Sequence, residues 1–438
     1  MLIPSRETPA RRQIVVVGGG AGGLELVVQL ARKIDRRTEE LVLVDRAASH
    51  LWKPRLHEVA AGLLDASDDE VSYLGLAQLH GFRFHYGPLA GLDTERRILR
   101  LGAVENPAGG LVLGPRELSY DDLVLAIGSR VNDFGISGVN EHCHMLDSPA
   151  QAAAFNRCFL DAALQISEGQ RDSLTVGIVG AGATGVELAA ELRHAVVELR
   201  RYGGLGIDSP LELILVDMTA RVLADADVRI SDYAQDRLTK LGVKLRLGET
   251  VSSVTSEGLH LKSGEIIPCD LKVWASGIVG LKIAEGLQGL QLERSKRIVT
   301  DAYGACVGVD HVYAMGDCAA TPNQLAGSIL PATAQVAHQQ AGYLATALMR
   351  RRRGRPVKPF VYHPRGTLVS LGPVQATAEL PGFRKNQRRI STHGAIPKLL
   401  YVSLQYMHRA SIFGWPRAAA IGLSDLLRRT TAPPIKLH

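Results

Sequence analysis

The most informative pattern along the chain occurs twice: a short apolar run, a cluster of glycines, and then apolar residues three to four positions apart. In the first copy, IVVVGGGAGGLELVVQLA, residues 14–17 predict a buried strand and the residues after the glycines predict a helix. The second copy, LTVGIVGAGATGVELAAEL, has the same order. A further apolar strand follows each copy and ends in an acid, Asp45 in the first and Asp217 in the second. Strands that alternate with helices in this way predict an α/β fold.

The glycines of both copies have the spacing GxGxxG. They are Gly18, Gly20 and Gly23 in the first copy, and Gly180, Gly182 and Gly185 in the second. In this motif the first glycine permits a tight turn, the second lets the backbone approach a pyrophosphate, and the third lets the helix pack closely on the strand. The helix that follows offers free N–H groups and a positive dipole end to a phosphate. The sequence therefore predicts two Rossmann-like dinucleotide-binding domains.

The acids after the two motifs strengthen this prediction. A tight turn without a ligand is the alternative for a single motif, but here both copies have the strand, the helix and the acid. Asp45 follows Gly18 by 27 residues, whereas Asp217 follows Gly180 by 37, with the extra length in RRYGGLGIDSP. An acid at the end of this strand binds the ribose diol of NADH and repels the 2′-phosphate of NADPH, so Asp217 favours NADH. Arg221, four residues later, could accept a 2′-phosphate and leaves NADPH open as a substrate. Two dinucleotide sites in one chain indicate electron transfer between two carriers.

Three further segments, LVLAIGSR, VWASGIVG and HVYAMGDCAA, are apolar strands that break into glycine turns. The first GxGxxG, Ala126 with Gly128, and Gly316 with Asp317 resemble the three flavin signatures of the two-dinucleotide-binding-domain flavoproteins. This resemblance implies that the first repeat binds FAD and the second binds NADH. It also implies that Asp317 bonds the ribityl chain of FAD, whereas the alternative is an aspartate that only closes a turn or caps a helix.

Longer motifs narrow the resemblance. Disulfide reductases of this fold have CxxxxC after the first ribose acid, but this chain has HLWKPRLHEVAAGLLD there, without cysteine. That segment, AQVAHQQ, the tail YVSLQYMHRASIFGWPRAAAIGLSDLL and the final KLH resemble type II NADH dehydrogenases over residues 12–438. These are single-chain, membrane-attached NADH:quinone oxidoreductases that do not pump protons. One departure is Arg55, where the family pattern usually has an apolar residue.

The resemblance implies three catalytic residues. Glu187, in GVELAAEL, matches the family glutamate near the contact of nicotinamide and flavin, and Gln335 and Gln339 match the quinone-site motif AQxAxQ. A helix pattern from residue 331 to about residue 350 places both glutamines on one face. The alternative for Glu187 is a glutamate that is favoured only by the dipole at the start of its helix. The alternative for Gln335 and Gln339 is an ordinary polar helix face. His338 lies on another face, and we expect it to be solvated rather than catalytic.

Composition limits the class of protein. Hydrophobic residues make up 46% and charged residues 21% of the 438 positions, which is typical of a globular protein. The five scattered cysteines predict neither a disulfide framework nor a metal site, and they suit a reducing compartment. No apolar stretch has the length of a signal peptide or of a membrane-spanning helix. We expect an intracellular protein that does not cross a membrane.

Positive charge is concentrated at the end of the chain. The net charge is +6, but residues 350–438 alone carry 17 basic and two acidic side chains. Within this region, residues 398–413 predict a helix with a broad apolar face and with Gln405, His408 and Arg409 opposite, and residues 417–429 predict a second amphipathic helix. Basic amphipathic helices of this kind lie on anionic lipid, where Trp415 would be an interface anchor. The alternative to lipid binding is that these helices pack on the protein body or form a homodimer interface. Binding of nucleic acid is less expected, because the sequence shows no aromatic platform on which bases would stack.

These observations predict an FAD-binding domain in residues 1–150 and 290–360, an inserted NADH-binding domain in residues 151–289, and a membrane-docking region in residues 361–438. The predicted function is FAD-dependent NADH:quinone oxidoreduction in a respiratory chain, on the cytoplasmic face of the inner membrane. Two alternatives stay open. A sulfide:quinone oxidoreductase would use flavin-facing cysteines such as Cys143, Cys158 and Cys318, and a redox-sensing adaptor would bind FAD and NADH without turnover.

Overall fold

A computed structural model describes residues 11–201, 211–380 and 390–431 of the chain, and the chain packs as two compact units. The first unit comprises Met1–Trp52, Glu70–Arg130 and Val279–His363. The second comprises Lys53–Asp69, Val131–Ile278 and Pro364–His438. These units are defined by packing, whereas the domain ranges expected from the sequence follow the cofactor motifs, so those ranges stay predictions.

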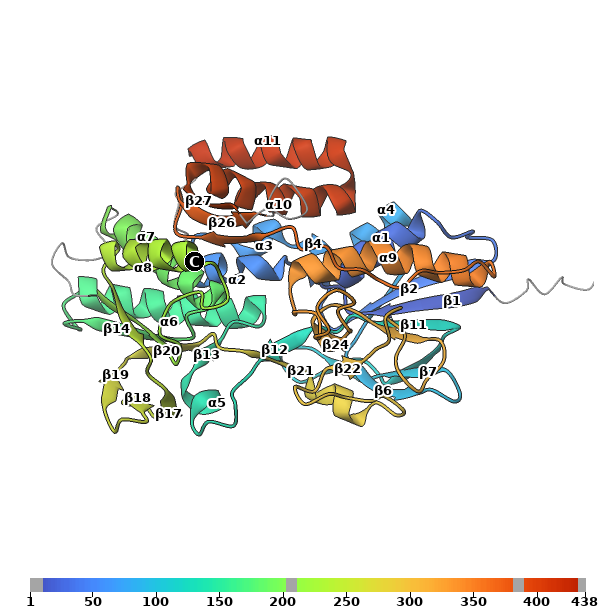
Figure 1. Cartoon of the computed structure of the whole chain (residues 1–438), viewed down its shortest axis with the longest axis horizontal. Helices are drawn as coiled ribbons and strands as arrows, with labels where there is room; N and C mark the ends of the chain where they lie inside the picture. The colour runs from blue at the N-terminus through green and yellow to red at the C-terminus, as the bar shows by residue number, and fades with distance from the viewer. Residues whose placement is uncertain (1–10, 202–210, 381–389, 432–438) are drawn as a thin grey trace, which may run out of the picture. The chain divides into compact units, whose positions relative to one another are not determined.

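The first unit is built on a parallel five-stranded sheet in the order β23-β11-β1-β2-β5. Its strands are β1 (Arg12–Val17), β2 (Glu39–Asp45), β5 (Arg83–Tyr86), β11 (Asp122–Leu125) and β23 (Val312–Ala314). Helix α1 (Ala21–Ala31) packs against α9 (Ala334–Arg352), and the two lie side by side in Figure 1. Val15, Leu123 and Val312 are fully buried in the core between the sheets. The strands and the helix expected around the first glycine motif are confirmed.

Smaller elements complete the first unit. They are β3 (Ser49–His50), β4 (Val71–Ser72), α4 (Tyr73–His80), β6 (Leu89–Asp93), β7 (Ile98–Leu101), β8 (Val104–Glu105), β9 (Leu111–Leu113), β10 (Arg116–Ser119), η2 (Lys282–Gly286), β22 (Ile298–Val299), η3 (Gly316–Cys318) and β24 (Ala319–Ala320). Helix α9 begins at Ala334, three residues after the expected start, because the hydroxyl of Thr333 accepts a hydrogen bond from Val336 N and caps the helix there.

The second unit repeats the same architecture. Its parallel sheet has the order β13-β20-β14-β15-β16, with strands β13 (His144–Met145), β14 (Leu174–Val179), β15 (Leu211–Asp217), β16 (Val243–Leu247) and β20 (Leu271–Trp274). Helix α7 (Ala183–Arg201) follows the second glycine motif, as predicted. Most of the expected connection RRYGGLGIDSP lies outside the described residues.

Other elements surround this sheet. They are η1 (Lys53–Arg55), α2 (Leu56–Ala60), α3 (Ala66–Asp69), α5 (Val139–His142), α6 (Pro149–Ser167), α8 (Val228–Lys240), β17 (Val251–Val254), β18 (Gly258–Leu261), β19 (Ile266–Pro268), β25 (Thr367–Ser370), β26 (Ala376–Leu380) and β27 (Ile390–Gly394). The short strands β12 (Ser129–Val131) and β21 (Ile278–Gly280) lie where the chain passes from one unit to the other.

Two C-terminal helices belong to the second unit. Helix α10 (Ala395–Phe413) packs on the antiparallel sheet β25-β26-β27, and α11 (Trp415–Thr431) packs on α10 (Figure 1). Both helices were predicted, but one expected polar face was wrong: His408 is buried, and the Arg409 side chain is 13% exposed because it pairs with Asp69 and Asp425. Within the described ranges, no helix is long and apolar enough to span a bilayer. The final KLH lies outside those ranges.

Candidate active site

The first glycine turn is tightly packed at two of its three glycines and open at the third. Gly18 has φ +101°, and an added Cβ would overlap the carbonyl of Ala126; one on Gly23 would overlap the carbonyl of Gly18. No atom lies within 4 Å of the position of a Cβ on Gly20, where α1 begins without a side-chain cap. Open space beside uncapped N–H groups is what a bound pyrophosphate requires. The turn therefore fits a dinucleotide.

Asp45 supports this turn from the end of β2. Its Oδ2 accepts a hydrogen bond from Gly19 N at 2.5 Å and its Oδ1 accepts one from Ala47 N at 2.7 Å. Burial raises the pKa of Asp45 above its ordinary value, although these two amides oppose the shift. The carbonyl of Gly19 also contacts His50 Nδ1 at 2.9 Å and accepts from the Tyr73 hydroxyl at 2.7 Å. Asp45 thus has a structural role in addition to its predicted contact with ribose.

The three flavin-like segments meet at one edge of the first sheet. Strand β11 lies between β1 and β23, so their carboxyl ends bring Ala126 and Gly128 beside Gly18 and the Gly316–Asp317 turn. Ligands of such sheets bind outside the carboxyl ends of the strands. Gly316 N donates to Gln340 Oε1 at 2.7 Å, and Ser129 Oγ donates to Asp317 Oδ2 at 3.3 Å.

The second glycine turn has the same construction. Gly180 has φ +112° and an added Cβ would lie 2.7 Å from the carbonyl oxygen of Ala275, while one on Gly185 would overlap Gly180. An added Cβ on Gly182 would again meet no atom within 4 Å. Asp217 Oδ2 accepts from Ala181 N at 2.6 Å. This turn therefore fits a second dinucleotide, while the contacts of Asp217 and Gly182 with a ligand stay predictions.

Glu187 lies on α7 and is buried. Its Oε1 accepts a hydrogen bond from Ser370 N at 3.0 Å, and its Oε2 lies 3.5 Å from His57 Nδ1. Burial raises the pKa of Glu187 to about 8 and lowers the pKa of His57 to about 4. At pH 7 both groups are therefore neutral, with the proton on Glu187. The first turn of α7 contains no acidic residue, so the helix dipole does not explain Glu187.

Three residues that were not predicted complete the surroundings of Glu187. Ser370 Oγ donates to Glu191 Oε1 at 3.2 Å and accepts from Lys398 Nζ at 2.7 Å. Burial raises the pKa of Glu191 to about 7, against the opposing charge of Lys398, whose Nζ lies 3.9 Å from Glu191 Oε1. Two glutamates four residues apart within the apolar stretch VELAAEL were the available sequence signal. Lys398 links this cluster to α10.

Arg55, the departure from the family pattern, has a local explanation. Its guanidinium lies 2.6 Å from Glu58 Oε2 and 2.6 Å from Asp69 Oδ2, and its side chain is 9% exposed. Burial is the largest single influence on Glu58 and would raise its pKa, but the charge and hydrogen bonds of Arg55, together with the smaller effect of His57 and Lys398, lower the pKa below its ordinary value. Arg409 of α10 also pairs with Asp69. Arg55 therefore neutralises Glu58, which an apolar residue would leave without this partner, and it shares Asp69 with Arg409.

The two glutamines on α9 share a face, as predicted. The Tyr362 hydroxyl donates to Gln335 Oε1 at 2.7 Å, and Gln339 Nε2 donates to the carbonyl of His363 at 2.8 Å. Both side chains thus hold the segment after the helix, and their quinone role stays a prediction. His338 is 41% exposed but is not simply solvated, because its Nδ1 lies 2.5 Å from the buried Glu25 Oε2.

All five cysteines are free thiols, and four of them, all except Cys158, lie in surroundings that make a thiol poorly reactive. Burial raises the pKa of Cys318 to about 11 and that of Cys143 to about 12, whereas Cys158 is exposed. A thiol with such a raised pKa is a weak nucleophile near neutral pH. In the part of the chain that the structure describes, no group of three or more His, Cys, Asp or Glu side chains is placed to hold a metal ion.

Comparison with known proteins places this geometry in context. The family model for pyridine nucleotide-disulphide oxidoreductases matches residues 12–341. The type II NADH:quinone oxidoreductase of Haemophilus influenzae is 36% identical, over 98% of this chain and 100% of that protein. NdhA, a type II NADH:quinone oxidoreductase of Mycobacterium tuberculosis, is 27% identical over 84% of this chain and 79% of that protein.

Solved structures share the fold. NDH2 from Plasmodium falciparum in complex with NADH has a TM-score of 0.80 at 17% identity, covering 98% of this chain and 100% of that one. The sulfide:quinone oxidoreductase of Aquifex aeolicus has a TM-score of 0.71 at 15% identity, with 92% of each chain covered. At these identities the likeness concerns the fold alone.

Proposed function

Since the chain belongs to the pyridine nucleotide-disulphide oxidoreductase family and, within it, to the type II NADH:quinone oxidoreductases, we propose that it transfers electrons from NADH to a membrane quinone by way of bound FAD. The observation that carries this proposal is the 36% identity that extends over the whole of the Haemophilus influenzae relative. Two separate glycine turns, each fitting a dinucleotide, support it independently.

The first unit would hold FAD. Gly20 and the uncapped start of α1 would bind its pyrophosphate, Asp45 its adenosine ribose and Asp317 its ribityl chain. The segment from Ala126 to Gly128 would line the same site. When bound, FAD supplies a ring that accepts hydride from NADH and passes electrons on singly or in pairs. The protein contributes position and electrostatics.

The second unit would hold NADH. Gly182 leaves room for its pyrophosphate at the start of α7, in the tight turn that Gly180 and Gly185 permit. Asp217 at the end of β15 would bind the adenosine ribose. Because Asp217 already accepts from Ala181 N, its carboxylate is held in one orientation before the substrate binds. Such preorganisation reduces the cost of ordering the site on binding.

The overall reaction consumes one proton: NADH, quinone and a proton give NAD⁺ and quinol. Glu187 is suited to hold this proton, since burial raises its pKa to about 8 and Ser370 N fixes its Oε1. His57 remains neutral beside it and so does not take the proton from Glu187 at pH 7. We infer that Glu187 is the residue of this cluster that donates a proton, with Gln335 and Gln339 at the quinone site.

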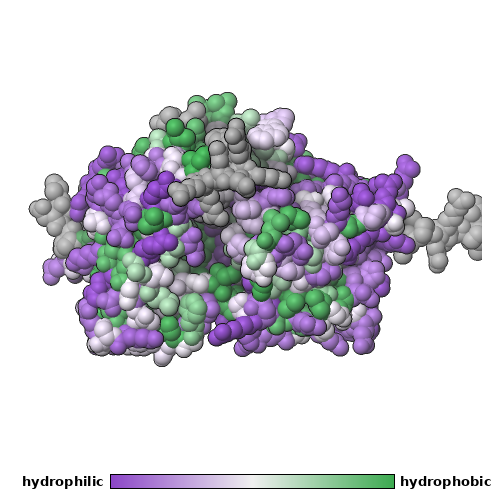
Figure 2. All heavy atoms as spheres, viewed as in Figure 1, coloured by the Kyte–Doolittle hydropathy of each residue, from purple (hydrophilic) through white to green (hydrophobic). Residues whose placement is uncertain are grey.

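We propose that α10 and α11 attach the second unit to the anionic surface of the inner membrane, on its cytoplasmic face. Several of their large apolar side chains face solvent: Ile396 (73% exposed), Leu399 (71%), Trp415 (70%), Leu423 (60%) and Leu427 (60%). Figure 2 shows green apolar side chains at the top of the second unit, where Figure 1 places these helices. Binding of lipid would remove this area from water. If it instead formed a homodimer interface, the protein would dimerise without binding vesicles.

Transfer of electrons without proton pumping is part of the proposal, as the family resemblance implies. Enzyme reconstituted in sealed liposomes should oxidise NADH with quinone and leave the internal pH unchanged. A pH gradient that forms during turnover would contradict this part.

Steady-state kinetics test the proposed function. Purified protein with bound FAD should oxidise NADH rapidly when a quinone analogue is present. Turnover with sulfide in place of NADH would favour the sulfide:quinone alternative, but the raised pKa values of Cys143 and Cys318 argue against persulfide chemistry. Tight binding of NADH without turnover would favour the adaptor alternative.

A further inference from the structure

The arginine-rich turn at the end of α9 is not used by the proposed function. Two of its arginines have structural partners within the first unit. Arg351 Nη1 donates to the Tyr313 hydroxyl at 3.1 Å, and Arg352 Nη2 lies 2.7 Å from Asp122 Oδ2. These contacts hold the end of α9 on the sheet and leave the other arginines of the turn unexplained.

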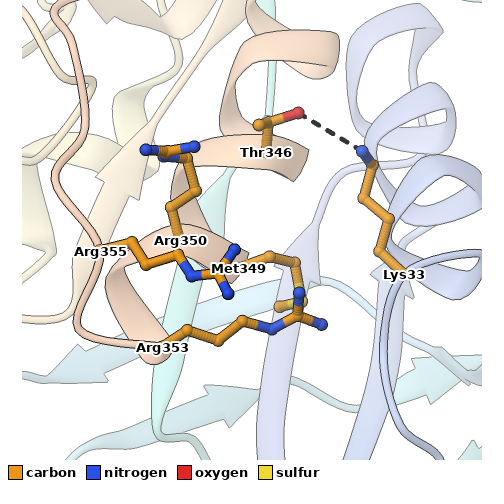
Figure 3. A pocket seen from close by; sticks show the side chains of 6 residues that line it. All are labelled: Lys33, Thr346, Met349, Arg350, Arg353 and Arg355. Carbon is orange, nitrogen blue, oxygen red and sulfur yellow. Dashed lines mark hydrogen bonds between the residues drawn. The ribbon is translucent and has the colours of Figure 1, made fainter.

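The remaining arginines line a pocket of about 250 Å³ together with a lysine from the turn after α1. Its lining residues are Lys33, Thr346, Met349, Arg350, Arg353 and Arg355. Figure 3 shows Lys33 entering from one side and the arginines from the other, with Lys33 Nζ donating to Thr346 Oγ1 at 3.4 Å. No carboxylate lines this pocket, and among the described residues none of its four cations is paired with one.

The backbone of the turn is held in a defined conformation. Gly354 has φ +64°, which favours glycine, and its N–H donates to the Arg351 carbonyl at 2.9 Å. Arg355 N donates to the Arg350 carbonyl at 2.8 Å, so the helix ends in a Schellman motif. Arg350 Nε donates to the carbonyl of Pro356 at 2.8 Å. The three arginines therefore project from a turn whose backbone conformation is fixed by its own hydrogen bonds.

The helix dipoles do not balance the charge of the pocket. The C-terminal ends of α1 and α9 each contribute about half a negative charge, against four full positive charges. An adjoining pocket, which shares Arg353, contains two carboxylates, Asp35 and Glu39, but also three further arginines, Arg12, Arg37 and Arg352. Because Arg352 pairs with Glu39 and Asp122, the adjoining pocket does not offset the four lining cations, and their excess of positive charge calls for an anion.

We propose that this pocket binds a phosphate group, carried either by a soluble phosphate compound or by an anionic lipid headgroup. Guanidinium groups present pairs of N–H donors that match phosphate oxygens, and such charge-assisted hydrogen bonds are the stronger class. The volume of about 250 Å³ far exceeds the ~15 Å³ that one water needs, so a phosphate and part of its substituent fit. This site is separate from both glycine turns.

Inorganic pyrophosphate is the probe for the shared chemistry. Its binding to the FAD-loaded enzyme is measured by calorimetry with NAD⁺ in excess, so that the second glycine turn is filled. The double variant Arg353→Gln/Arg355→Gln should bind pyrophosphate at least about tenfold more weakly. The matched double variant Arg96→Gln/Arg294→Gln removes the same charge from exposed positions of the same unit and should bind like the wild type. Unchanged FAD content and NADH oxidation in both variants establish that they are folded.

Vesicles distinguish the two sources of phosphate. Co-sedimentation is compared on phosphatidylcholine vesicles with and without phosphatidylglycerol. If the Arg353/Arg355 variant, unlike the matched variant, requires more phosphatidylglycerol in the vesicles to co-sediment, the pocket binds a lipid headgroup. If its co-sedimentation is unchanged while its binding of pyrophosphate falls, the pocket binds a soluble phosphate compound. Equal behaviour of the two double variants in both assays would overturn the proposal.

Discussion

The protonation of Glu187 makes a quantitative prediction for the stability of the protein. Burial raises its pKa from 4.5 to about 8, so between these values the folded protein holds a proton that the unfolded chain has lost. The folded state binds more protons, and the free energy of unfolding therefore falls as pH rises, by about 1.4 kcal/mol per pH unit for one group. The stabilisation is complete below pH 4.5 and is lost as pH rises through 8.

Substitution of Glu187 by Gln isolates this contribution. Glutamine has the shape of the protonated acid and cannot ionise, so the variant should lose the part of the pH dependence that Glu187 causes. Between pH 5.5 and 7.5, the wild type should lose about 2 to 3 kcal/mol of unfolding free energy relative to the variant. Glu191 is present in both proteins and contributes a pH dependence of its own to each, so the comparison isolates Glu187 together with its coupling to Glu191.

Urea unfolding at a series of pH values measures the effect. Trp274 is buried in the second unit and contributes a fluorescence change on unfolding. Glu257→Gln, at an exposed position of the same unit, is the matched control and should follow the wild type. If the free energies of unfolding of the wild type and Glu187→Gln changed with pH in the same way, the reasoning would be refuted. Glu187 would then be ionised in the folded protein.

Three other predictions concern cofactor binding, membrane binding and the buried ion pairs. Gly182→Val should raise KM for NADH at least tenfold and leave FAD content unchanged, whereas Gly20→Val should empty the FAD site, because each side chain would enter the open space of one turn. Leu423→Glu with Leu427→Glu should abolish sedimentation with anionic vesicles, while oxidation of NADH by a soluble quinone continues. This double variant changes only exposed side chains, whereas deletion of residues 398–438 also removes buried residues of α10. Arg55→Met should lower the free energy of unfolding, measured in urea, by about 3–5 kcal/mol, because it leaves the buried Glu58 without its partner, whereas Asp69 keeps Arg409.

The sequence predicted the parts of the fold that local patterns determine. The spacing of glycines around Gly18 and Gly180 requires a turn with positive φ and a close helix, whatever lies elsewhere in the chain, and both turns have this geometry. The strands that end at Asp45 and Asp217 were predicted for the same reason. The contacts of these residues with ligands stay predictions.

The cluster around Glu187 could not be predicted in this way. His57, Ser370 and Lys398 come from segments more than 100 residues away from Glu187, and none of them belongs to a motif with a fixed spacing to it. Helical periodicity likewise assigned Arg409 to a polar face, because periodicity does not show that a buried carboxylate such as Asp69 lies opposite. Tertiary contacts, rather than propensity, decide these positions.

The visible absorption spectrum of the purified protein tests the central claim most directly. Under anaerobic conditions the protein should show the bands of oxidised flavin, lose them when NADH is added, and regain them when a quinone analogue follows. A protein that remains colourless after reconstitution with FAD, or whose flavin NADH does not bleach, would contradict the account.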